Sequence, residues 1–139
     1  MNAIDTNVFV YATDSDEPTK QAKAKNLLVK LVLASTQTFL LWQVAGELLS
    51  CMRRWESRGK ISAMDVEDNI RDVLRSFPMV IPNENVITRS LSLSSRYSLS
   101  HWDSMLLAAC IEAGVDTLYS EDLSDGVTYD SVQVVNPFL

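Results

Sequence analysis

The chain opens with Met1-Asn2-Ala3-Ile4-Asp5, a short apolar segment that ends in a carboxylate. Residues 2–5 are expected to form a buried strand, followed by a turn at Thr6-Asn7 and a second apolar stretch over residues 8–12. An ionised carboxylate is rarely left among apolar residues unless something pairs with it. The segment therefore predicts a buried first strand whose terminal acid needs a partner.

Strand and helix patterns alternate along the rest of the chain. Helical periodicity covers residues 19–33, 43–58, 62–76, 84–97 and 100–113, and short apolar strands are expected at 39–42, 79–81, 117–119 and 132–135. Nearly continuous apolar strands between helices are typical of a mostly parallel sheet covered on both faces. Because no repeat or linker interrupts the pattern, we predict one α/β domain over residues 1–139, a three-layer α/β/α sandwich with a mostly parallel central sheet.

Composition indicates an ordinary globular protein, with 47% hydrophobic and 22% charged residues in a chain of 139. The net charge of −6 argues against a broad basic surface for nucleic acid, unless several acids are metal ligands. No run approaches the roughly 20 apolar residues of a membrane helix, and no basic leader precedes Asp5. Cys51 and Cys110 stand among apolar neighbours, as buried thiols do in a reducing cytosol. We expect a cytoplasmic protein.

Four acids are out of place by the ordinary rules of where charge lies: Asp5, Glu47, Asp103 and Asp122. Asp5 ends a predicted strand, Asp122 follows another, and Glu47 and Asp103 lie early in predicted helices. In a parallel sheet, the carboxyl ends of strands and the amino ends of the adjoining helices meet at one edge, where ligands bind. All four acids are therefore expected at the same edge.

The helical register predicts that Asp103 faces the sheet, because it shares a stripe with Leu107 and Cys110. Two carboxylates about 5 Å apart repel by roughly 3 kcal/mol at an effective dielectric of 20. A helix dipole offsets only about 0.3–1 kcal/mol for each. Four close acids must therefore raise their pKa values or bind metal, and sites rich in carboxylates suit Mg²⁺ or Mn²⁺.

A site of this kind predicts hydrolysis of a phosphodiester bond by a metal-activated water. The chain offers no evident alternative nucleophile, because His101 is its only histidine and is expected to be structural or at the rim. A basic ridge at Arg53, Arg54 and Arg58 follows Glu47 on the same predicted helix. Such a ridge is usually a solvated face, but here it could reach substrate phosphates.

Each acid also has a purely structural explanation. Asp5 could form a turn with Thr6-Asn7, and Asp103, three residues after Ser100, could complete a capping box. Glu47 could extend into solvent, and Asp122 could lie in a hydrated loop. The three tryptophans (Trp42, Trp55 and Trp102) are most simply core residues, although one of them could serve a groove that binds a partner. Only the expected convergence of the four acids favours the metal interpretation.

Four short motifs carry a resemblance to a known family: Ile-Asp-Thr-Asn-Val at 4–8, Gln-Val-x-x-Glu at 43–47, Ser-x-Trp-Asp at 100–103 and Leu-Tyr-Ser-Glu-Asp-Leu at 118–123. With the closing Val-Val-Asn-Pro-Phe at 134–138, they resemble PIN-domain ribonucleases, and more closely the VapC toxins of bacterial toxin–antitoxin pairs. The resemblance extends over essentially the whole chain.

The resemblance implies that Asp5, Glu47, Asp103 and Asp122 form the acidic metal-binding cluster, with Ser120, Thr6 and Asn7 in support. It also implies Mg²⁺- or Mn²⁺-dependent endoribonuclease activity on RNA, a homodimer, and inhibition by a cognate antitoxin whose tail blocks the acidic pocket. The residues before Glu47, Ala45-Gly46, depart from the family pattern, which often has a polar residue there.

Asp122 is preferred to Glu121 as the last acid because of the Ser-x-Asp register, although the choice between them stays open here. The number of metal ions, the RNA that is cut and the antitoxin's identity are likewise open.

Two alternatives remain. A carboxylate–Mg²⁺ phosphotransfer protein would need either a second aspartate at position 7, which is Asn7, or a lysine late in the chain, where the last is Lys60. A non-catalytic interaction module on the same scaffold would need neither. The presence of all four acids favours the nuclease interpretation over such a module.

Overall fold

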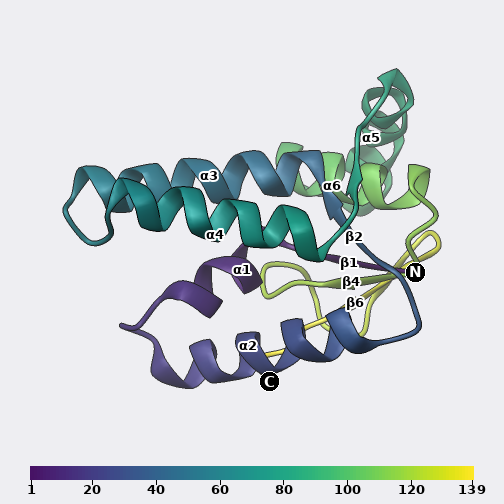
Figure 1. Cartoon of the computed structure of the whole chain (residues 1–139). Helices are drawn as coiled ribbons and strands as arrows, with labels where there is room; N and C mark the ends of the chain where they lie inside the picture. Colours follow the sequence, from purple (N-terminus) through teal and green to yellow (C-terminus); the bar gives the residue numbers. More distant parts are fainter.

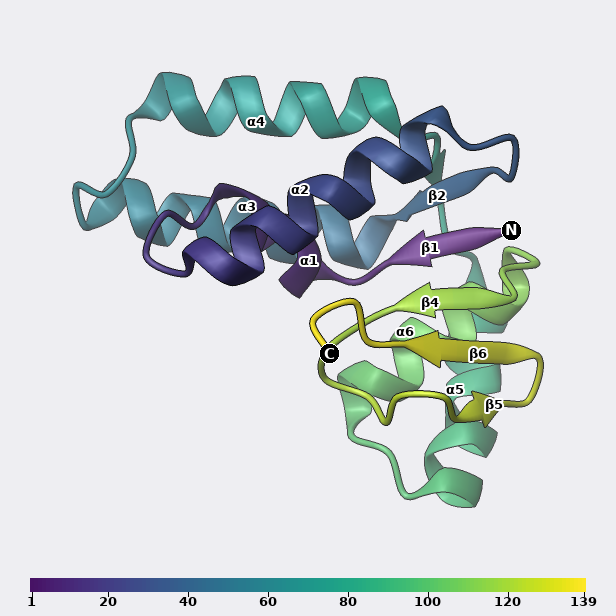
Figure 2. The same cartoon turned by 90° about the horizontal axis from the view of Figure 1, so that it is seen from below.

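The computed structural model describes residues 1–139, which form six strands in one sheet. The strands are β1 (Asn2–Ile4), β2 (Thr38–Leu41), β3 (Met79–Val80), β4 (Thr117–Tyr119), β5 (Thr128–Tyr129) and β6 (Val132–Val135). Their order is β3-β2-β1-β4-β6-β5, and every neighbouring pair is parallel except β5 with β6. Figure 2 shows β5 running opposite to the other arrows.

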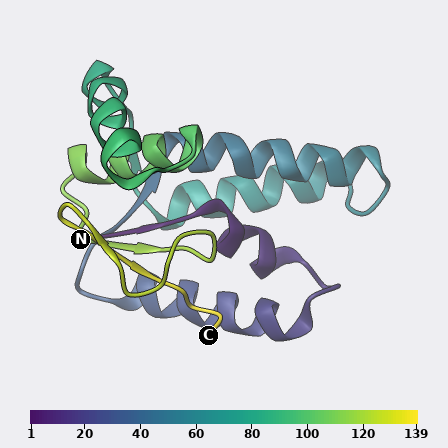
Figure 3. The ribbon, with the colours of Figure 1, turned by 180° about the vertical axis from the view of Figure 1, so that it is seen from behind.

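Six helices connect and cover this sheet: α1 (Thr6–Thr13), α2 (Pro18–Leu33), α3 (Trp42–Ser57), α4 (Ala63–Ser76), α5 (Glu84–Tyr97) and α6 (His101–Glu112). In Figures 1 and 3, α3, α5 and α6 lie on one side of the sheet and α2 lies on the other. The predicted α/β fold with a mostly parallel sheet is therefore confirmed.

The central strand β1 explains why the first acid lies where it does. Its residues Ala3 and Ile4 are fully buried between β2 and β4, because both faces of the sheet are covered. The Asp5 N–H donates to the Tyr119 carbonyl (2.9 Å), which extends the β1–β4 pairing by one residue. Asp5 is thereby held beside the residues that follow β4.

Helix ends follow the signals in the sequence. Ser62 caps α4 in a complete capping box with Asp65, and the Ser100 side chain caps α6. After α6, Gly114 adopts a positive φ of 73°, the left-handed conformation that glycine adopts at no steric cost. The predicted range 84–97 coincides with α5.

The structure departs from the local predictions in three places. Residues 6–13, expected as a turn and an apolar stretch, form helix α1, because the Asp5 carboxylate caps them and Val8 and Phe9 are buried in the core. The antiparallel strand β5 was not predicted, since two residues show no alternation. The predicted strand 39–42 lies one residue earlier, at 38–41, and Trp42 begins α3.

One core contains apolar residues from both layers of helices and from the sheet. Ile4, Leu118 and Val134 contribute from the strands, Leu107 from α6 on one side and Leu31 from α2 on the other. Cys110 is buried as expected, whereas the prediction was wrong for Cys51, which is only partly buried. None of the helices is both long and apolar enough to cross a membrane.

Candidate active site

Asp5 is the most buried acid of the chain, with only 6% of its surface exposed. Oδ1 accepts from the Thr6 N–H (2.7 Å), and Oδ2 accepts from the Ser120 hydroxyl (2.7 Å). Ser120 is itself fully buried, so this contact is shielded from water. The expectation that Asp5 and Ser120 lie together is met.

Burial destabilises the ionised form of Asp5. Loss of hydration raises the pKa of Asp5 to about 6, although hydrogen bonds from Ser120 and Thr6 oppose the shift. The negative charges of Asp122 and Glu47 raise the pKa further. The ionised form of Asp5 is therefore destabilised in the metal-free protein. A nearby cation would stabilise this anion and lower its pKa.

Asn7 connects Asp5 to Asp122. Its side-chain Nδ2 donates to Asp122 Oδ2 (3.1 Å) and more weakly to Asp5 Oδ2 (3.4 Å). The Asp122 N–H donates to the Ser120 hydroxyl (3.1 Å), which in turn donates to Asp5. These contacts join the ends of β1 and β4 in one polar network.

Glu47 enters the network from α3, on which it is exposed. Its Oε2 accepts from the Thr6 hydroxyl (2.9 Å), and its Oε1 accepts from Gln43 Nε2 (2.8 Å), one turn earlier. Gln43 also donates to the Trp102 carbonyl at the start of α6 (3.3 Å). The sequence predicted no role for Gln43, although its spacing of four residues from Glu47 places the two side chains on one face of a helix.

Asp103 lies in the first turn of α6 and is partly buried. The Ser100 hydroxyl accepts from the Asp103 N–H (3.3 Å), but the Asp103 carboxylate makes no hydrogen bond or ion pair. In α4, by contrast, the Asp65 carboxylate accepts a hydrogen bond from the Ser62 N–H (3.0 Å), which completes a capping box. Helix capping therefore accounts for Ser100 but leaves the Asp103 side chain unexplained.

The donor set fits Mg²⁺ or Mn²⁺ in its chemistry but is not a preformed cluster. Asp5, Glu47 and Asp122 offer carboxylate oxygens at one edge, and Asn7 Oδ1 is buried without any hydrogen-bond partner. No three acidic, histidine or cysteine side chains are arranged to hold an ion together. No direct contact links Asp103 to the other acids, so the four-ligand assignment stays a prediction.

A pocket of about 1130 Å³ opens beside these residues. Thr6, Asn7, Glu47 and Asp122 line one part of it, and apolar residues of α3, α6 and the segment after β3 line much of the rest. The pocket thus connects the acidic edge with an apolar groove.

Trp42 and Trp102 line this groove. The core was the simpler expectation for both, with a groove position left open for one tryptophan. Trp42 is 57% exposed and Trp102 is 61% exposed, because each lies in the first turn of its helix, where the sheet edge ends. Trp55 is partly buried and also lines the groove. His101 is exposed and packs edge-on against Trp102, with ring centroids 4.5 Å apart, as expected for a rim residue.

The arginine ridge is exposed and lies next to the same groove. Arg53, Arg54 and Arg58 line a second hollow of about 640 Å³, together with Gly46 and Ser50, which also line the main pocket. Arg54 donates to the Ser50 hydroxyl (3.1 Å), and none of the three arginines pairs with an acid. Their charge is therefore available to an anionic ligand.

The fold and this edge define an α/β protein with an acidic site at the carboxyl end of a parallel sheet. The PIN domain family profile matches residues 3–124, and the chain belongs to this family. No curated protein sequence gives a significant match.

Solved structures resemble the whole fold. A toxin–antitoxin complex from Klebsiella pneumoniae aligns with a TM-score of 0.70 at 19% identity, over 99% of this chain and 98% of that chain. VapBC-1 from nontypeable Haemophilus influenzae aligns with a TM-score of 0.68 at 12% identity, over 98% and 97%. Mycobacterium tuberculosis VapC20, a Sarcin-Ricin loop cleaving toxin, aligns with a TM-score of 0.62 at 12% identity, over 88% and 90%.

Proposed function

We propose that this chain is a Mg²⁺- or Mn²⁺-dependent endoribonuclease that acts in the cytoplasm as the toxin of a toxin–antitoxin pair. The main support is the buried Asp5 carboxylate. Asn7 bonds it to Asp122, and Thr6, which follows it, bonds to Glu47. A buried anion beside two other acids favours a cation as its missing partner.

Family and fold support the choice of RNA as substrate. The chain is a PIN-domain protein, and one protein of similar fold is a toxin that cleaves the Sarcin-Ricin loop. The free arginines of α3 give a chain of net charge −6 a local place for phosphates beside the acids. Both features suit an RNA strand laid across the carboxyl edge of the sheet.

The chain's own residues have distinct roles in this proposal. Asp5, Glu47, Asp103 and Asp122 would hold the metal, and Asp5 would be its most fixed ligand because three donors orient it. When bound, Mg²⁺ or Mn²⁺ supplies a lowered pKa for the attacking water and charge stabilisation at the scissile phosphate.

Supporting residues orient these acids. Asn7 turns Asp122 toward Asp5, and Thr6 turns Glu47 toward the same edge. The buried Ser120 hydroxyl bridges the Asp5 carboxylate and the Asp122 backbone, so it fixes their separation. None of these supporting residues needs to act as a nucleophile.

RNA cleavage with Mn²⁺ tests the proposal. We expect the parent protein to cut a structured RNA. EDTA removes the metal ion and Asp103→Asn removes one of its charged ligands, so we expect either change to abolish cleavage. Asp68→Asn is the matched control, since Asp68 is an exposed acid on α4 without contacts to the site. Cleavage that persists in EDTA would contradict metal dependence.

One observation favours a non-catalytic interaction module on the same scaffold: no three potential ligands are arranged to hold a metal ion. The same assay separates the two functions. A folded parent protein that cuts no RNA with Mn²⁺ or Mg²⁺ would favour the module. A phosphotransfer protein has no such support. Position 7 is Asn7 and not a second aspartate, and Lys60, the last lysine, does not lie late in the chain.

The groove suits an antitoxin segment with apolar and basic side chains. Its walls combine apolar surface with three acids that have no cationic partner, Glu17, Glu47 and Asp122, against one arginine, Arg54. The other two lining acids are already paired, Asp14 with Lys60 and Glu112 with Arg89. An amphipathic segment with apolar anchors and basic residues would therefore bind there and cover the acidic edge. This is the inhibitor that we propose, and its binding should protect RNA from cleavage.

A second copy of the chain is the other proposed partner. Helix α5 has two large apolar residues facing solvent, Ile87 (60% exposed) and Leu91 (69% exposed). Figure 1 shows α5 projecting beside α6 at one end of the molecule, where a copy could pack. Light scattering should give the mass of a dimer, and Leu91→Glu should give a monomer; a parent monomer would exclude this assignment.

A further inference from the structure

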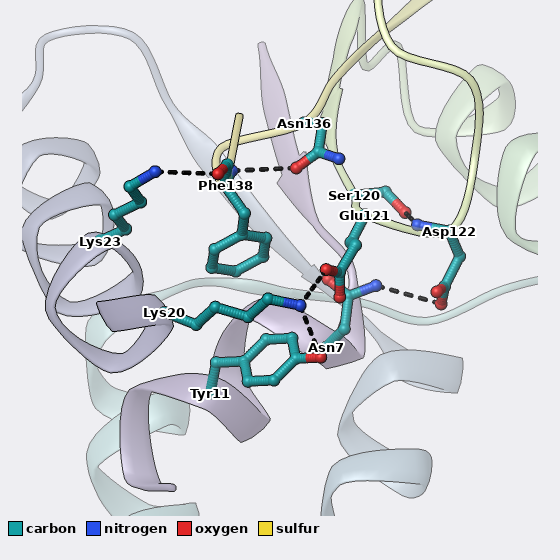
Figure 4. A network of polar contacts seen from close by, with 9 residues as sticks. All are labelled: Asn7, Tyr11, Lys20, Lys23, Ser120, Glu121, Asp122, Asn136 and Phe138. Atoms are coloured by element: carbon teal, nitrogen blue, oxygen red, sulfur yellow. Dashed lines mark hydrogen bonds and ion pairs between the residues drawn. The ribbon is translucent and has the colours of Figure 1, made fainter. Parts of the chain in front are cut away.

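A lysine of α2 is bonded to the loop that follows β4. Lys20 Nζ pairs with the Glu121 carboxylate and also donates to the Tyr11 hydroxyl (3.2 Å) (Figure 4). The side chains of Lys20 and Glu121 are only 33% and 26% exposed, and 101 positions separate them in sequence. This is therefore a long-range tertiary contact, unlike the ion pairs within single helices.

Aromatic rings enclose the lysine. Its Nζ lies 4.5 Å from the Tyr11 ring centroid and 5.6 Å from that of Phe138, and the two rings pack edge-on at 5.0 Å. Cations are attracted to aromatic faces, so this setting favours one position of the ammonium group. The Glu121 hydrogen bond also raises the pKa of Lys20 and keeps it charged.

The C-terminal segment completes the enclosure. Lys23 Nζ donates to the Phe138 carbonyl (2.8 Å), and the Phe138 N–H donates to Asn136 Oδ1 (2.9 Å), as Figure 4 shows. The Asn136 N–H in turn donates to Asp125 Oδ1 (2.7 Å), farther along the loop that carries Glu121. The last residues of the chain thus hold Phe138 against Tyr11.

The two consecutive acids of this loop are bonded to different parts of the molecule. Glu121 reaches Lys20 on α2, whereas Asp122 reaches Asn7 in α1 and its own N–H donates to Ser120 (Figure 4). Only Asp122 lines the pocket beside the acidic edge. Because adjacent side chains cannot exchange places without turning the loop, the position of one fixes the position of the other.

We propose that Lys20 is a positioning residue for the site: by binding Glu121 between Tyr11 and Phe138, it keeps that carboxylate away from the acids and directs Asp122 toward them. The inference rests on the proposed function of this site. It assigns Asp122, and not Glu121, as the acid that acts there, and it gives the C-terminal Phe138 a part in the activity.

Substitutions separate this role from a general effect on folding. Lys20→Met should lower kcat for RNA cleavage by about tenfold, with KM little changed, because a coupling of about 1.4 kcal/mol corresponds to a factor of ten. Lys20→Arg should retain most activity, since it preserves the charge. The double variant Lys20→Met with Glu121→Gln should recover activity relative to Lys20→Met, because no free carboxylate remains. Lys25→Met is the matched control, an exposed lysine of the same helix without partners.

A second readout needs neither RNA nor metal. The side-chain amide signal of Asn7 in an NMR spectrum reports its bond to Asp122, and Asn7 does not contact Lys20. We expect this signal to shift in Lys20→Met and to stay unchanged in Lys25→Met. If the parent protein cut no RNA but the Asn7 signal shifted in Lys20→Met, only the proposed function would be contradicted. An unshifted Asn7 signal, or unchanged kcat in Lys20→Met, would overturn the role of Lys20.

Discussion

Asp5 shows how a single misplaced charge can identify a site. Its position after a buried strand predicted that the carboxylate would be removed from water, and the structure buries it. Its three hydrogen-bond donors only partly offset that loss, since its pKa is raised to about 6. The residue thus lowers the stability of the metal-free protein, as functional residues often do.

This cost predicts an unusual pH dependence for Asp5→Asn. Asp5 has a pKa of about 6 when folded and 3.8 as its ordinary value, so the folded state binds more protons between these values and stability falls as pH rises through them. Asp5→Asn removes this buried charge. With EDTA present, its free energy of unfolding relative to that of the parent should therefore increase from pH 4 to pH 7.5, by about 3 kcal/mol at most.

Urea unfolding at several pH values measures this difference, and effects of other titrating groups cancel in the comparison. Asp68→Asn, which alters an exposed acid outside the site, is measured beside it as the control variant. A difference for Asp5→Asn that does not change with pH would mean that burial does not destabilise the ionised Asp5.

Not every residue of the site could be found from sequence. Asp5, Asp122 and Glu47 stood out because charge is unexpected where they lie, and the structure links them. Lys20 gave no signal, because an amphipathic helix has many lysines and its partner Glu121 lies 101 positions away. The exposure of Trp42 was missed because an aromatic residue next to a strand is ordinarily buried.

At the scale of elements, local rules worked where a helix end is fixed by its own residues. Ser62 and Asp65 predicted the start of α4, and the strands β4 and β6 have the predicted bounds. Helix α1 was missed because its run of β-branched and aromatic residues from Val8 to Tyr11 has low helix propensity. Packing against α2 and α3 and the cap by Asp5 stabilise it instead.

The two serine caps provide a paired test at this scale. Ser100→Ala should cost about 1 kcal/mol of stability, the usual value for a lost N-cap, and should also lower RNA cleavage, because the capped turn of α6 carries Asp103. Ser62→Ala should cost a similar amount but leave cleavage unchanged, since α4 carries no acid of the site.

Urea unfolding and an RNA cleavage assay with Mn²⁺ check both variants. If the two substitutions lowered activity equally, the effect would be one of general stability, and the first turn of α6 would have no special role at the site.

At the scale of the whole molecule, the lysine and arginine side chains without an acidic partner are confined to two regions of the surface. The lysines and arginines without an acidic partner lie on or directly after two helices: Lys23, Lys25 and Lys30 on α2, and Arg53, Arg54 and the C-cap residue Arg58 on and after α3. Only those of α3 line a hollow next to the acidic edge. RNA should therefore be held by α3 and not by the surface as a whole.

Replacing Arg53, Arg54 and Arg58 together by glutamine should weaken RNA binding and raise KM with little change in kcat. Because each neutralised phosphate contributes about 0.7 to the salt slope for single strands, the slope of log K against log salt should fall by about 2. Fluorescence anisotropy at several salt concentrations measures it. The double variant Lys25→Gln with Lys30→Gln is the control, and an equal loss there would refute a local phosphate site.

The central claim is that acids from four separate segments bind a divalent ion at one edge of the sheet. Titration calorimetry of the metal-free protein with Mn²⁺ tests it most directly. We predict saturable uptake by the parent protein and by Asp68→Asn, and none by Asp5→Asn or Asp103→Asn at the same concentrations. Absence of Mn²⁺ uptake by the parent protein, or equal uptake by all four proteins, would contradict the account.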